Sequence, residues 1–146
     1  MPKSTPTCNS LLNLMYRAAA WANVADNAAA SPLTNVVVAL HTATLTAATN
    51  SQAENEVAYT NYARQNVARS TGWNAASGGS TANAALLQFP QSGATGATLA
   101  AVSTGTTISG ATPVWHYGAL NSPITIGAAA SITPQFLAGA LQITET

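Results

Sequence analysis

The hydrophobic pattern of the chain changes character once, near residue 26. From Asn9 to about Ala25 the chain is rich in helix-forming residues, and Leu11 and Met15 begin an apolar stripe at helical spacing. Asn9 or Ser10 can provide the N-cap. We therefore predict one helix of about four turns, whose apolar stripe packs against the rest of the protein.

After residue 26 the pattern becomes that of a β-domain, because short runs of Val, Ile, Leu, Thr and Tyr alternate with Gly, Pro, Asn and Ser. About seven short strands of this kind predict a single antiparallel β-sandwich or jelly-roll-like domain. The stretches SGGSTAN and SGATGAT have the composition of loops. The predicted strands are Asn35–Thr44, Val57–Ala68 with an interruption, Ala84–Phe89, Thr98–Ser103, Pro113–Leu120, Ile124–Ile126 and Ala138–Thr144.

These elements predict a chain of three parts. Residues 1–8, which include Pro2 and Pro6, form an extended arm that either frays or docks on a neighbour. Residues 9–27 form the helix, which packs on the β-domain or links to it. Residues 28–146 form the β-sandwich domain, in which the first strand is apolar on both faces and is therefore expected to be central.

The charge content limits the possible partners. Charged residues make up 5% of the 146-residue chain and the formal net charge is zero, against a usual charged fraction of about 25%. The only basic residues are Lys3, Arg17, Arg64 and Arg69, so the clustered cations that nucleic-acid binding requires are missing. A net charge near zero promotes association. We therefore expect the chain to function inside an assembly.

Two further classes are disfavoured by the sequence. Cys8 is the only cysteine, which excludes an intramolecular disulfide and a cysteine-rich zinc site. No segment approaches the roughly 18 apolar residues of a membrane span, and the first ten residues show no secretion signal. We expect a soluble protein that does not interact with membranes.

Candidate catalytic groups are few, which predicts that the protein is not an enzyme. The histidines are His41 and His116, both in strand-like runs, and the only aspartate is Asp26. No nucleophile elbow or phosphate-binding glycine loop accompanies them, and no cofactor site is predicted. Glu54 and Glu56 alternate onto one side of an extended chain and could share a cation, but two carboxylates make an incomplete metal site. A solvated or ion-paired loop is the favoured interpretation.

The stretch EVAYTNYARQNVAR, with Glu54 just before it, holds half of the charges in the chain. We predict an extended entry carrying Glu54 and Glu56, followed by a strand centred on TNYARQNVA, with Arg69 near its end. In a regular strand Tyr62 and Arg64 share one face, so the five donors of Arg64 could reach a carboxylate or several carbonyls. We therefore interpret Arg64 as a clamp that holds the entry segment, or the same segment of a neighbouring copy, against the sheet. The alternative is a solvent-facing arginine.

Six short motifs occur together in one order, and their combination resembles a known family. The motifs are ALHTA (39–43), NEV (55–57), YARQ (62–65), LLQFP (86–90), YGALNSPITI (117–126) and AGALQIT (138–144). In this order they resemble a family of small virion proteins of tailed bacteriophages, whose members are often labelled tail fibre proteins. The resemblance covers residues 33–146.

The resemblance implies a virion protein similar to capsid decoration or tail-associated β-proteins. The function we favour is a capsid decoration or cement protein that stabilises the head shell by binding the major capsid protein. A tail or tail-fibre component is the alternative, as is a receptor- or carbohydrate-binding module that would use exposed aromatic residues such as Tyr59, Trp73 and Trp115. The resemblance further implies self-association as a homotrimer.

Overall fold

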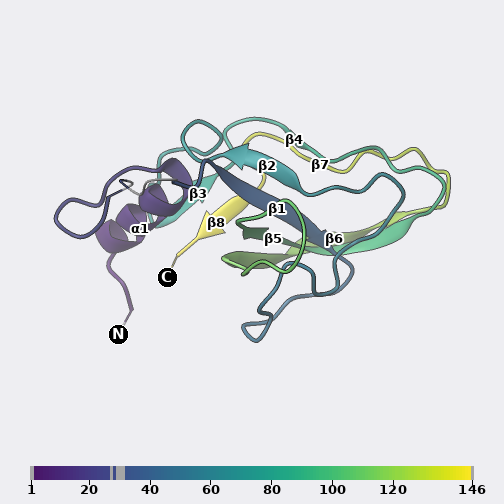
Figure 1. Cartoon of the computed structure of the whole chain (residues 1–146), viewed down its shortest axis with the longest axis horizontal. Coiled ribbons are helices and arrows are strands. Elements are labelled where there is room, and N and C mark those ends of the chain that lie inside the picture. Colours follow the sequence, from purple (N-terminus) through teal and green to yellow (C-terminus); the bar gives the residue numbers. More distant parts are fainter. Residues whose placement is uncertain (1, 27, 29–31, 146) are drawn as a thin grey trace. The chain divides into compact units, whose positions relative to one another are not determined.

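The computed structural model describes residues 2–26, 28 and 32–145, and Figure 1 labels its helix and strands. Its mainly β composition, with one helix and antiparallel sheets, confirms the predicted fold class. The elements are α1 (Thr5–Arg17), β1 (Asn35–His41), β2 (Gln65–Ala68), β3 (Ser80–Ala82), β4 (Leu87–Gln88), β5 (Ala97–Gly105), β6 (His116–Ile126), β7 (Gln135–Phe136) and β8 (Gln142–Thr144).

The tertiary contacts group the chain into two compact units that do not follow the order of the sequence. The helical unit combines Met1–Asn35, Val67–Leu87 and Phe136–Thr146, and the sheet unit combines Val36–Asn66 and Gln88–Gln135. In this grouping β3 and β8 belong with α1, whereas the sequence prediction placed them in residues 28–146 with the other strands.

The main sheet has four strands in the order β2-β1-β5-β6. Its central pair is antiparallel, with Val38 opposite Thr104 and Leu40 opposite Val102. Every residue of β1 after Asn35 is buried. Burial on both faces explains why this strand reads as a continuous apolar run, and the predicted central position of β1 is confirmed.

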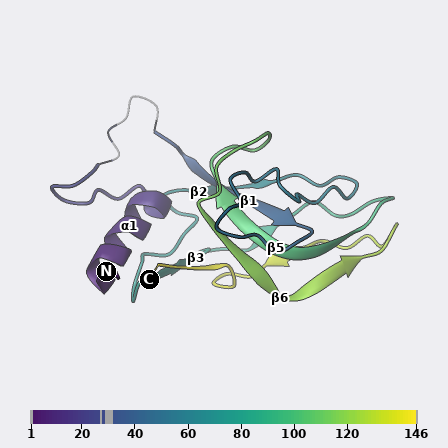
Figure 2. The same cartoon turned by 90° about the horizontal axis from the view of Figure 1, so that it is seen from below.

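The strand β6 is one element where the sequence predicts two. Ala119 pairs with Ala101, but the next pair along is Ile124 with Leu99. Four residues of β6 therefore lie opposite one residue of β5, and Figure 2 shows β6 bending in its middle. Pro123 lies in this irregular part, where a missing backbone N–H costs no ladder hydrogen bond. The sequence prediction placed the break between its two strands here, after Leu120 and before Ile124.

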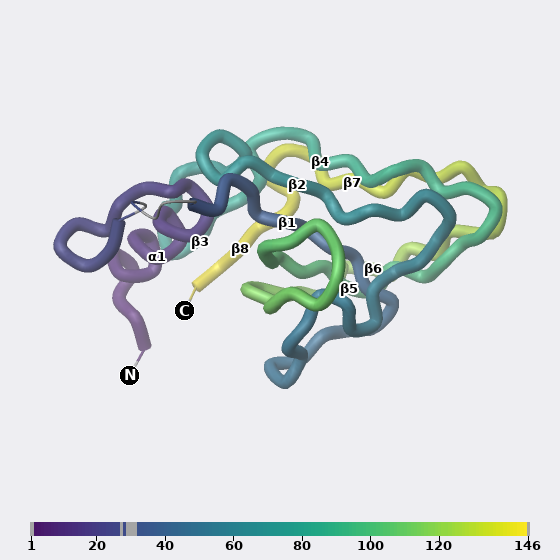
Figure 3. The backbone as a smooth tube through the Cα atoms, viewed as in Figure 1, coloured from purple at the N-terminus to yellow at the C-terminus, as the bar shows by residue number. Residues whose placement is uncertain are grey.

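A second pairing joins segments that lie far apart in the sequence. The short strands β4 and β7 form a two-stranded sheet. Beyond them the two segments run side by side, as Figure 3 shows, and the Ser92 N–H donates to the Ile132 carbonyl at 2.8 Å. The Ala129 N–H donates to the Gly93 carbonyl at 3.0 Å. The strand predicted for residues 84–89 is thus shortened to β4, and β7 was not predicted.

The helix α1 begins and ends earlier than predicted. It starts at Thr5 after an extended Ser4, with Pro6 in its first turn, and it ends before Ala18, which has a left-handed φ of 54°. Its buried residues are Cys8, Leu12 and Tyr16. The predicted stripe through Leu11 and Met15 is therefore displaced by one position.

The predicted extended arm is correspondingly wrong for residues 5–8, which form the first turn of α1. Proline is favoured in a first helical turn because the N–H that it lacks would have no helical partner there. The sequence prediction instead took Pro6 as a sign of extended chain. Before the helix, the Lys3 ammonium pairs with the Glu145 carboxylate at 3.1 Å, so the chain is also held two residues before Thr5.

The stretch SGGSTAN, predicted as a loop, forms a tight turn and the strand β3. Gly78 and Gly79 have φ values of 61° and 79°, which glycine adopts without strain. The turn feeds β3 into an antiparallel pair with β8. The helix contacts this turn, because the Asn9 Oδ1 atom accepts a hydrogen bond from the Gly79 N–H at 2.7 Å.

Candidate functional site

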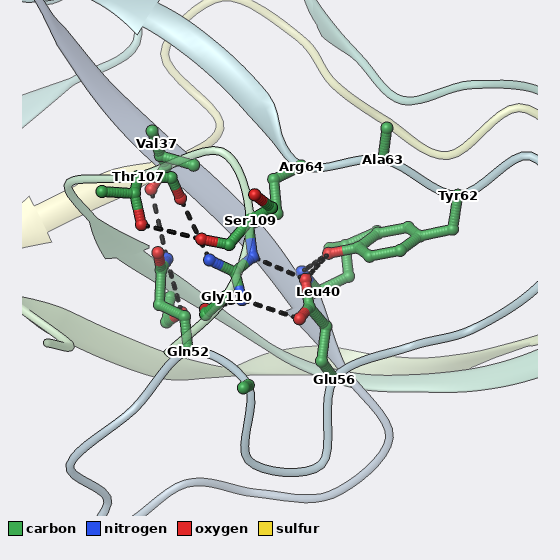
Figure 4. Close-up of polar contacts among 12 residues, drawn as sticks. Val37, Leu40, Gln52, Glu56, Tyr62, Ala63, Arg64, Thr107, Ser109 and Gly110 are labelled. Carbon is green, nitrogen blue, oxygen red and sulfur yellow. Dashed lines mark hydrogen bonds and ion pairs between the residues drawn. The ribbon is translucent and has the colours of Figure 1, made fainter. Parts of the chain in front are cut away.

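A polar cluster of the sheet unit is built around Arg64, whose side chain is 2% exposed. Its guanidinium group binds the Glu56 carboxylate at two points, with Nε donating to Oε1 and Nη2 donating to Oε2, each at 2.7 Å. Figure 4 shows the two groups facing each other. Parallel hydrogen bonds of this kind combine charge with fixed geometry and are among the strong ones in proteins.

The remaining donors of Arg64 hold the loop that follows β5. Nη1 donates to the Thr107 carbonyl at 3.0 Å and Nη2 donates to the Gly110 carbonyl at 2.9 Å. Hydrogen bonding to Glu56 raises the pKa of Arg64 above its ordinary value, although burial acts in the opposite direction. One arginine therefore joins the segment at residue 56 to the loop at residues 107–110.

Tyr62 completes the cluster through its hydroxyl group. The hydroxyl donates to the Glu56 Oε1 atom at 3.1 Å and accepts from the backbone N–H of Leu40 at 3.0 Å. Its ring stacks on Phe89, with 6.2 Å between ring centroids. Burial raises the pKa of the Tyr62 hydroxyl, so this group stays a proton donor to the carboxylate.

The local backbone differs from the predicted strand centred on TNYARQNVA. The strand β2 begins only at Gln65. Before it, Asn61 has a φ of 78° and the Tyr62 N–H donates to the Tyr59 carbonyl at 2.9 Å, which closes a turn. Asparagine tolerates this left-handed conformation better than most residues, and an extended strand cannot pass through it. Tyr62 and Arg64 therefore precede the strand and do not lie within it.

An open groove of about 620 Å³ lies over this cluster. Its lining includes Glu56, Tyr62 and Arg64, together with Ile108 and Ser109. The Glu56 side chain is 22% exposed, but both of its oxygens accept hydrogen bonds from Arg64. Both oxygens of this carboxylate are therefore engaged by a single guanidinium group.

A second polar network is fully buried in the sheet unit and was missed by the sequence prediction. His41 Nδ1 lies 2.9 Å from the Glu54 carbonyl, which can only accept, so Nδ1 carries the proton. His41 Nε2 then accepts from the Ser103 hydroxyl at 2.8 Å, and Ser103 accepts from the amide of Gln52 at 3.1 Å. Burial is the main cause that lowers the pKa of His41.

This network resembles a catalytic pair only in its residue types. His41 and Gln52 are 0% exposed and Ser103 is 1% exposed. A nucleophile must reach its substrate, and the third partner of a hydrolytic triad is here a backbone carbonyl. The sequence signal for this network was Ser103, a polar residue within the apolar strand β5. The partner of Ser103 could not be predicted, because it depends on the strand register.

The described hydrogen bonds of the Glu54 carboxylate do not involve the cluster around Arg64. Its Oε1 atom accepts hydrogen bonds from the backbone N–H groups of Asn50 and Ser51, at 2.9 and 3.1 Å. Glu54 thus closes its own loop, whereas Glu56 binds Arg64. Within the described part of the chain, no group of three or more His, Cys, Asp or Glu side chains could hold a metal ion. The two carboxylates therefore face different partners.

Arg69 belongs to the helical unit, where it binds the end of α1. Its guanidinium donates to the carbonyls of Leu14 and Met15 in the last turn of the helix, and to the carbonyl of Leu33 at 2.8 Å. Arg69 is 7% exposed and burial lowers its pKa. The five candidate residues thus divide into a cluster of Glu56, Tyr62 and Arg64, a loop closure by Glu54 and a helix contact by Arg69.

Two of the aromatic residues considered for carbohydrate binding are not on the surface. Trp73 is 0% exposed and lies edge-on to Tyr16, with 4.6 Å between centroids. Tyr59 is 2% exposed and donates from its hydroxyl to the Pro90 carbonyl. Both residues pack inside their units, so neither can provide a stacking platform for a sugar.

The family described as Podophage GP4 fiber I protein gp80 matches residues 3–144 of the chain. No curated protein matches the chain. Among the described residues, no helix is both long and apolar enough to cross a membrane.

Proposed function

Since this chain belongs to the podophage GP4 fiber I protein family and is a component of the bacteriophage virion, we propose that it is a non-enzymatic structural part of the phage fibre. The match over residues 3–144 carries this proposal, because it spans both compact units of the chain. The family description supports the fibre alternative of the sequence analysis. A decoration or cement role on the head shell stays a prediction.

Charged side chains of this protein bind other groups of the same chain, which supports a structural role. Arg64 and Glu56 bind each other, Lys3 binds Glu145, and Arg69 binds carbonyls at the end of α1. Groups that perform acid–base chemistry need access to substrate and a pKa suited to proton transfer. The charged groups of this protein instead join segments of its own backbone.

Self-association is the second part of the proposal. A chain with a formal net charge of zero and 5% charged residues has little charge repulsion to keep copies apart. We propose a homotrimer in the virion, in contact with other virion proteins. Analytical ultracentrifugation of the purified chain tests this stoichiometry.

The position in the particle can be tested by labelling intact virions. A gold-conjugated antibody raised against the purified chain should bind at the fibres in electron micrographs. Labelling spread over the head shell would instead support decoration and attachment to the major capsid protein. A particle with an epitope tag fused after residue 146 provides an independent label for the same comparison.

The absence of catalysis can be tested on the same particles. Purified virions and the isolated chain are incubated with host-wall polysaccharide and peptidoglycan. We expect no turnover that depends on this chain. Turnover that disappears in a Glu54→Gln or Glu56→Gln variant would contradict the non-enzymatic proposal.

A further inference from the structure

The buried network around His41 has one direction of hydrogen-bond donation. The Gln52 amide donates to the Ser103 hydroxyl at 3.1 Å, and Ser103 donates to His41 Nε2 at 2.8 Å. His41 Nδ1 then donates to the Glu54 carbonyl at 2.9 Å. The network therefore starts and ends on one short stretch, residues 52–54, and passes through β5 and β1 in between.

The network is complete when His41 is neutral. Gln52 Nε2 also donates to the Val37 carbonyl at 3.2 Å, as Figure 4 shows. Both hydrogens of the Gln52 amide, the hydroxyl hydrogen of Ser103 and the single N–H of neutral His41 are thus each used once. The acceptor left over is Gln52 Oε1, which is buried and has no hydrogen-bond partner among the described residues.

A second proton on His41 does not fit this arrangement. The imidazolium has two donors, so Nε2 would donate to the Ser103 oxygen, and the Ser103 hydrogen would need a new acceptor. Rotating the Gln52 amide to offer Oε1 would place that oxygen against the Val37 carbonyl oxygen. A buried hydrogen-bonding group without a partner is costly, and two facing acceptors repel each other. The closed network therefore opposes protonation of His41.

The charged groups around His41 do not remove this cost. Glu56 favours a proton on His41 and Arg64 opposes it, and these two side chains bind each other. The Tyr62 hydroxyl stays neutral because burial raises its pKa. The Glu54 carboxylate binds backbone N–H groups of its own loop. Burial is the main influence and lowers the pKa of His41.

The stretch of residues 42–55 is the part of the network that can open most easily. Its buried side chains are Leu45 and Gln52, and its other side chains are exposed or half-buried. The Thr42 N–H donates to the Asn55 carbonyl at 2.8 Å, and the Gln52 N–H donates to the Thr112 carbonyl at 2.9 Å. Exposed segments with few buried contacts open at a low free-energy cost. Opening this segment separates Gln52 from Ser103 and admits water to His41.

We propose that the His41 network is an acid-sensitive latch, which holds residues 42–55 against β1 and β5 and releases them when His41 takes up a proton. The latch is closed above about pH 6.5, the ordinary pKa of histidine, and opens progressively as the pH falls below it. The proposal concerns the folding of the sheet unit and does not rest on a role in the fibre or on self-association.

Hydrogen exchange of the full-length chain, followed by NMR from about pH 7.5 to pH 5, tests the latch directly. After correction for the intrinsic exchange rates, protection of the Thr42 and Gln52 amides should fall by up to about tenfold for each pH unit below about 6.5. The amides of Ser92 and Ala129 are controls, because they are hydrogen-bonded in the same unit outside the network. Constant protection at Thr42 and Gln52, or an equal fall at the controls, would overturn the proposal.

A pair of matched variants tests the role of Ser103 in keeping His41 neutral. Ser103→Ala removes the donor to Nε2, so the NMR titration midpoint of the His41 ring should rise by about 0.5 or more on the pH scale. Ser92→Ala is the control, because Ser92 is also buried but accepts from the Ile132 N–H. Circular dichroism melting shows whether each variant folds, and the exchange experiment on the parent chain needs neither variant. Equal midpoints in the two variants, or a parent midpoint at or above 6.5, would contradict the latch.

Discussion

Arg64 and Arg69 lie five residues apart in one charged segment, and both are buried, but they are held in different ways. Arg64 binds the Glu56 carboxylate at two points and two loop carbonyls. The described contacts of Arg69 are backbone carbonyls at the end of α1 and at Leu33. Their pKa values move in opposite directions, because the hydrogen bond to Glu56 dominates at Arg64 and burial dominates at Arg69.

The difference shows two ways in which a folded chain can accommodate a buried cation. At Arg64 a full negative charge compensates the guanidinium. At Arg69 the compensation comes from carbonyl dipoles, which at a helix C-terminus carry about half of an elementary charge in total. Removing the compensating group should therefore be more costly at Arg64, and changing the shape of the cation should matter at both sites.

The largest effect is expected for Glu56→Gln, which removes the negative charge but keeps the side-chain shape. Arg64 would remain buried as an uncompensated cation, so the free energy of unfolding should fall by about 3 kcal/mol. Urea denaturation measures this change. Glu54→Gln is the matched control, because Glu54 is exposed and should cost less than about 1 kcal/mol.

A double variant tests whether the cost arises from the buried cation. In Glu56→Gln, Arg64→Met no unpaired charge remains, and the loss of stability should be smaller than for Glu56→Gln alone. If the double variant loses as much stability as the two single variants together, then Arg64 and Glu56 act independently and the clamp hypothesis is wrong.

A smaller effect is expected for Arg64→Lys, which keeps the charge but removes the planar fork. Lysine cannot bind both Glu56 oxygens and both loop carbonyls at once, so we expect a loss of about 2 kcal/mol in unfolding free energy. Thermal melting followed by circular dichroism measures the change. A melting profile and an assembly profile identical to those of the parent would make Arg64 equivalent to an ordinary surface charge.

The corresponding change Arg69→Lys should cost about 1 kcal/mol, because an ammonium at the same helix end still interacts favourably with the carbonyl dipoles. The loss of stability should be confined to the C-terminal end of α1. Hydrogen exchange should accelerate at the amides of the last turn of α1, while the amides of β1 stay protected. Equal acceleration in both places would show that Arg69 supports the whole fold and not the helix end alone.

The smallest expected effect is a dependence of folding stability on pH, which arises from His41 in the sheet unit. Burial lowers the pKa of His41 in the folded state below its ordinary value of 6.5, so the unfolded chain binds the proton more readily. Stability is therefore complete above about pH 6.5 and declines as the pH falls below it. The groups that face His41 are the Glu54 carbonyl and Ser103, with Glu56 and Arg64 as the charges that act on it.

Urea midpoints measured between about pH 7.5 and pH 5.5 test this dependence in the range where histidine titrates. The parent and a His116→Asn variant should both lose stability toward the acid end. A flat profile in the parent, or a decline that disappears in His116→Asn, would show that His41 is not the responsible group.

Several features of this protein follow from the sequence alone. The mainly β class, the central position of the first strand and the presence of one helix depend on hydrophobic period and residue type, which are local properties. The ordered motifs likewise indicate the phage virion family, and the match over residues 3–144 confirms it. The sequence also predicted that Arg64 holds the segment carrying Glu54 and Glu56, in its own copy or a neighbouring one, because Tyr62 and Arg64 were expected on one face of a strand; it did not predict which carboxylate Arg64 binds.

Other features depend on contacts that no local pattern contains. The buried stripe of α1 contains Leu12 and Tyr16 and not Leu11 and Met15, because the unit on which the helix packs decides which side of it is covered. The pairing of His41 with Ser103 requires the register of β1 on β5. The division into two units requires β3 and β8 to meet although about 60 residues separate them.

The common physical reason is that the sequence expresses the preferences of each residue for a backbone conformation and for burial. Those preferences determined the class of this fold. The small number of charges follows directly from the composition of the chain. Which backbone carbonyls meet Arg69, and which carboxylate meets Arg64, is decided by strand register and chain reversal. These pairings join segments that are distant in sequence, so they exist only once the tertiary structure has formed.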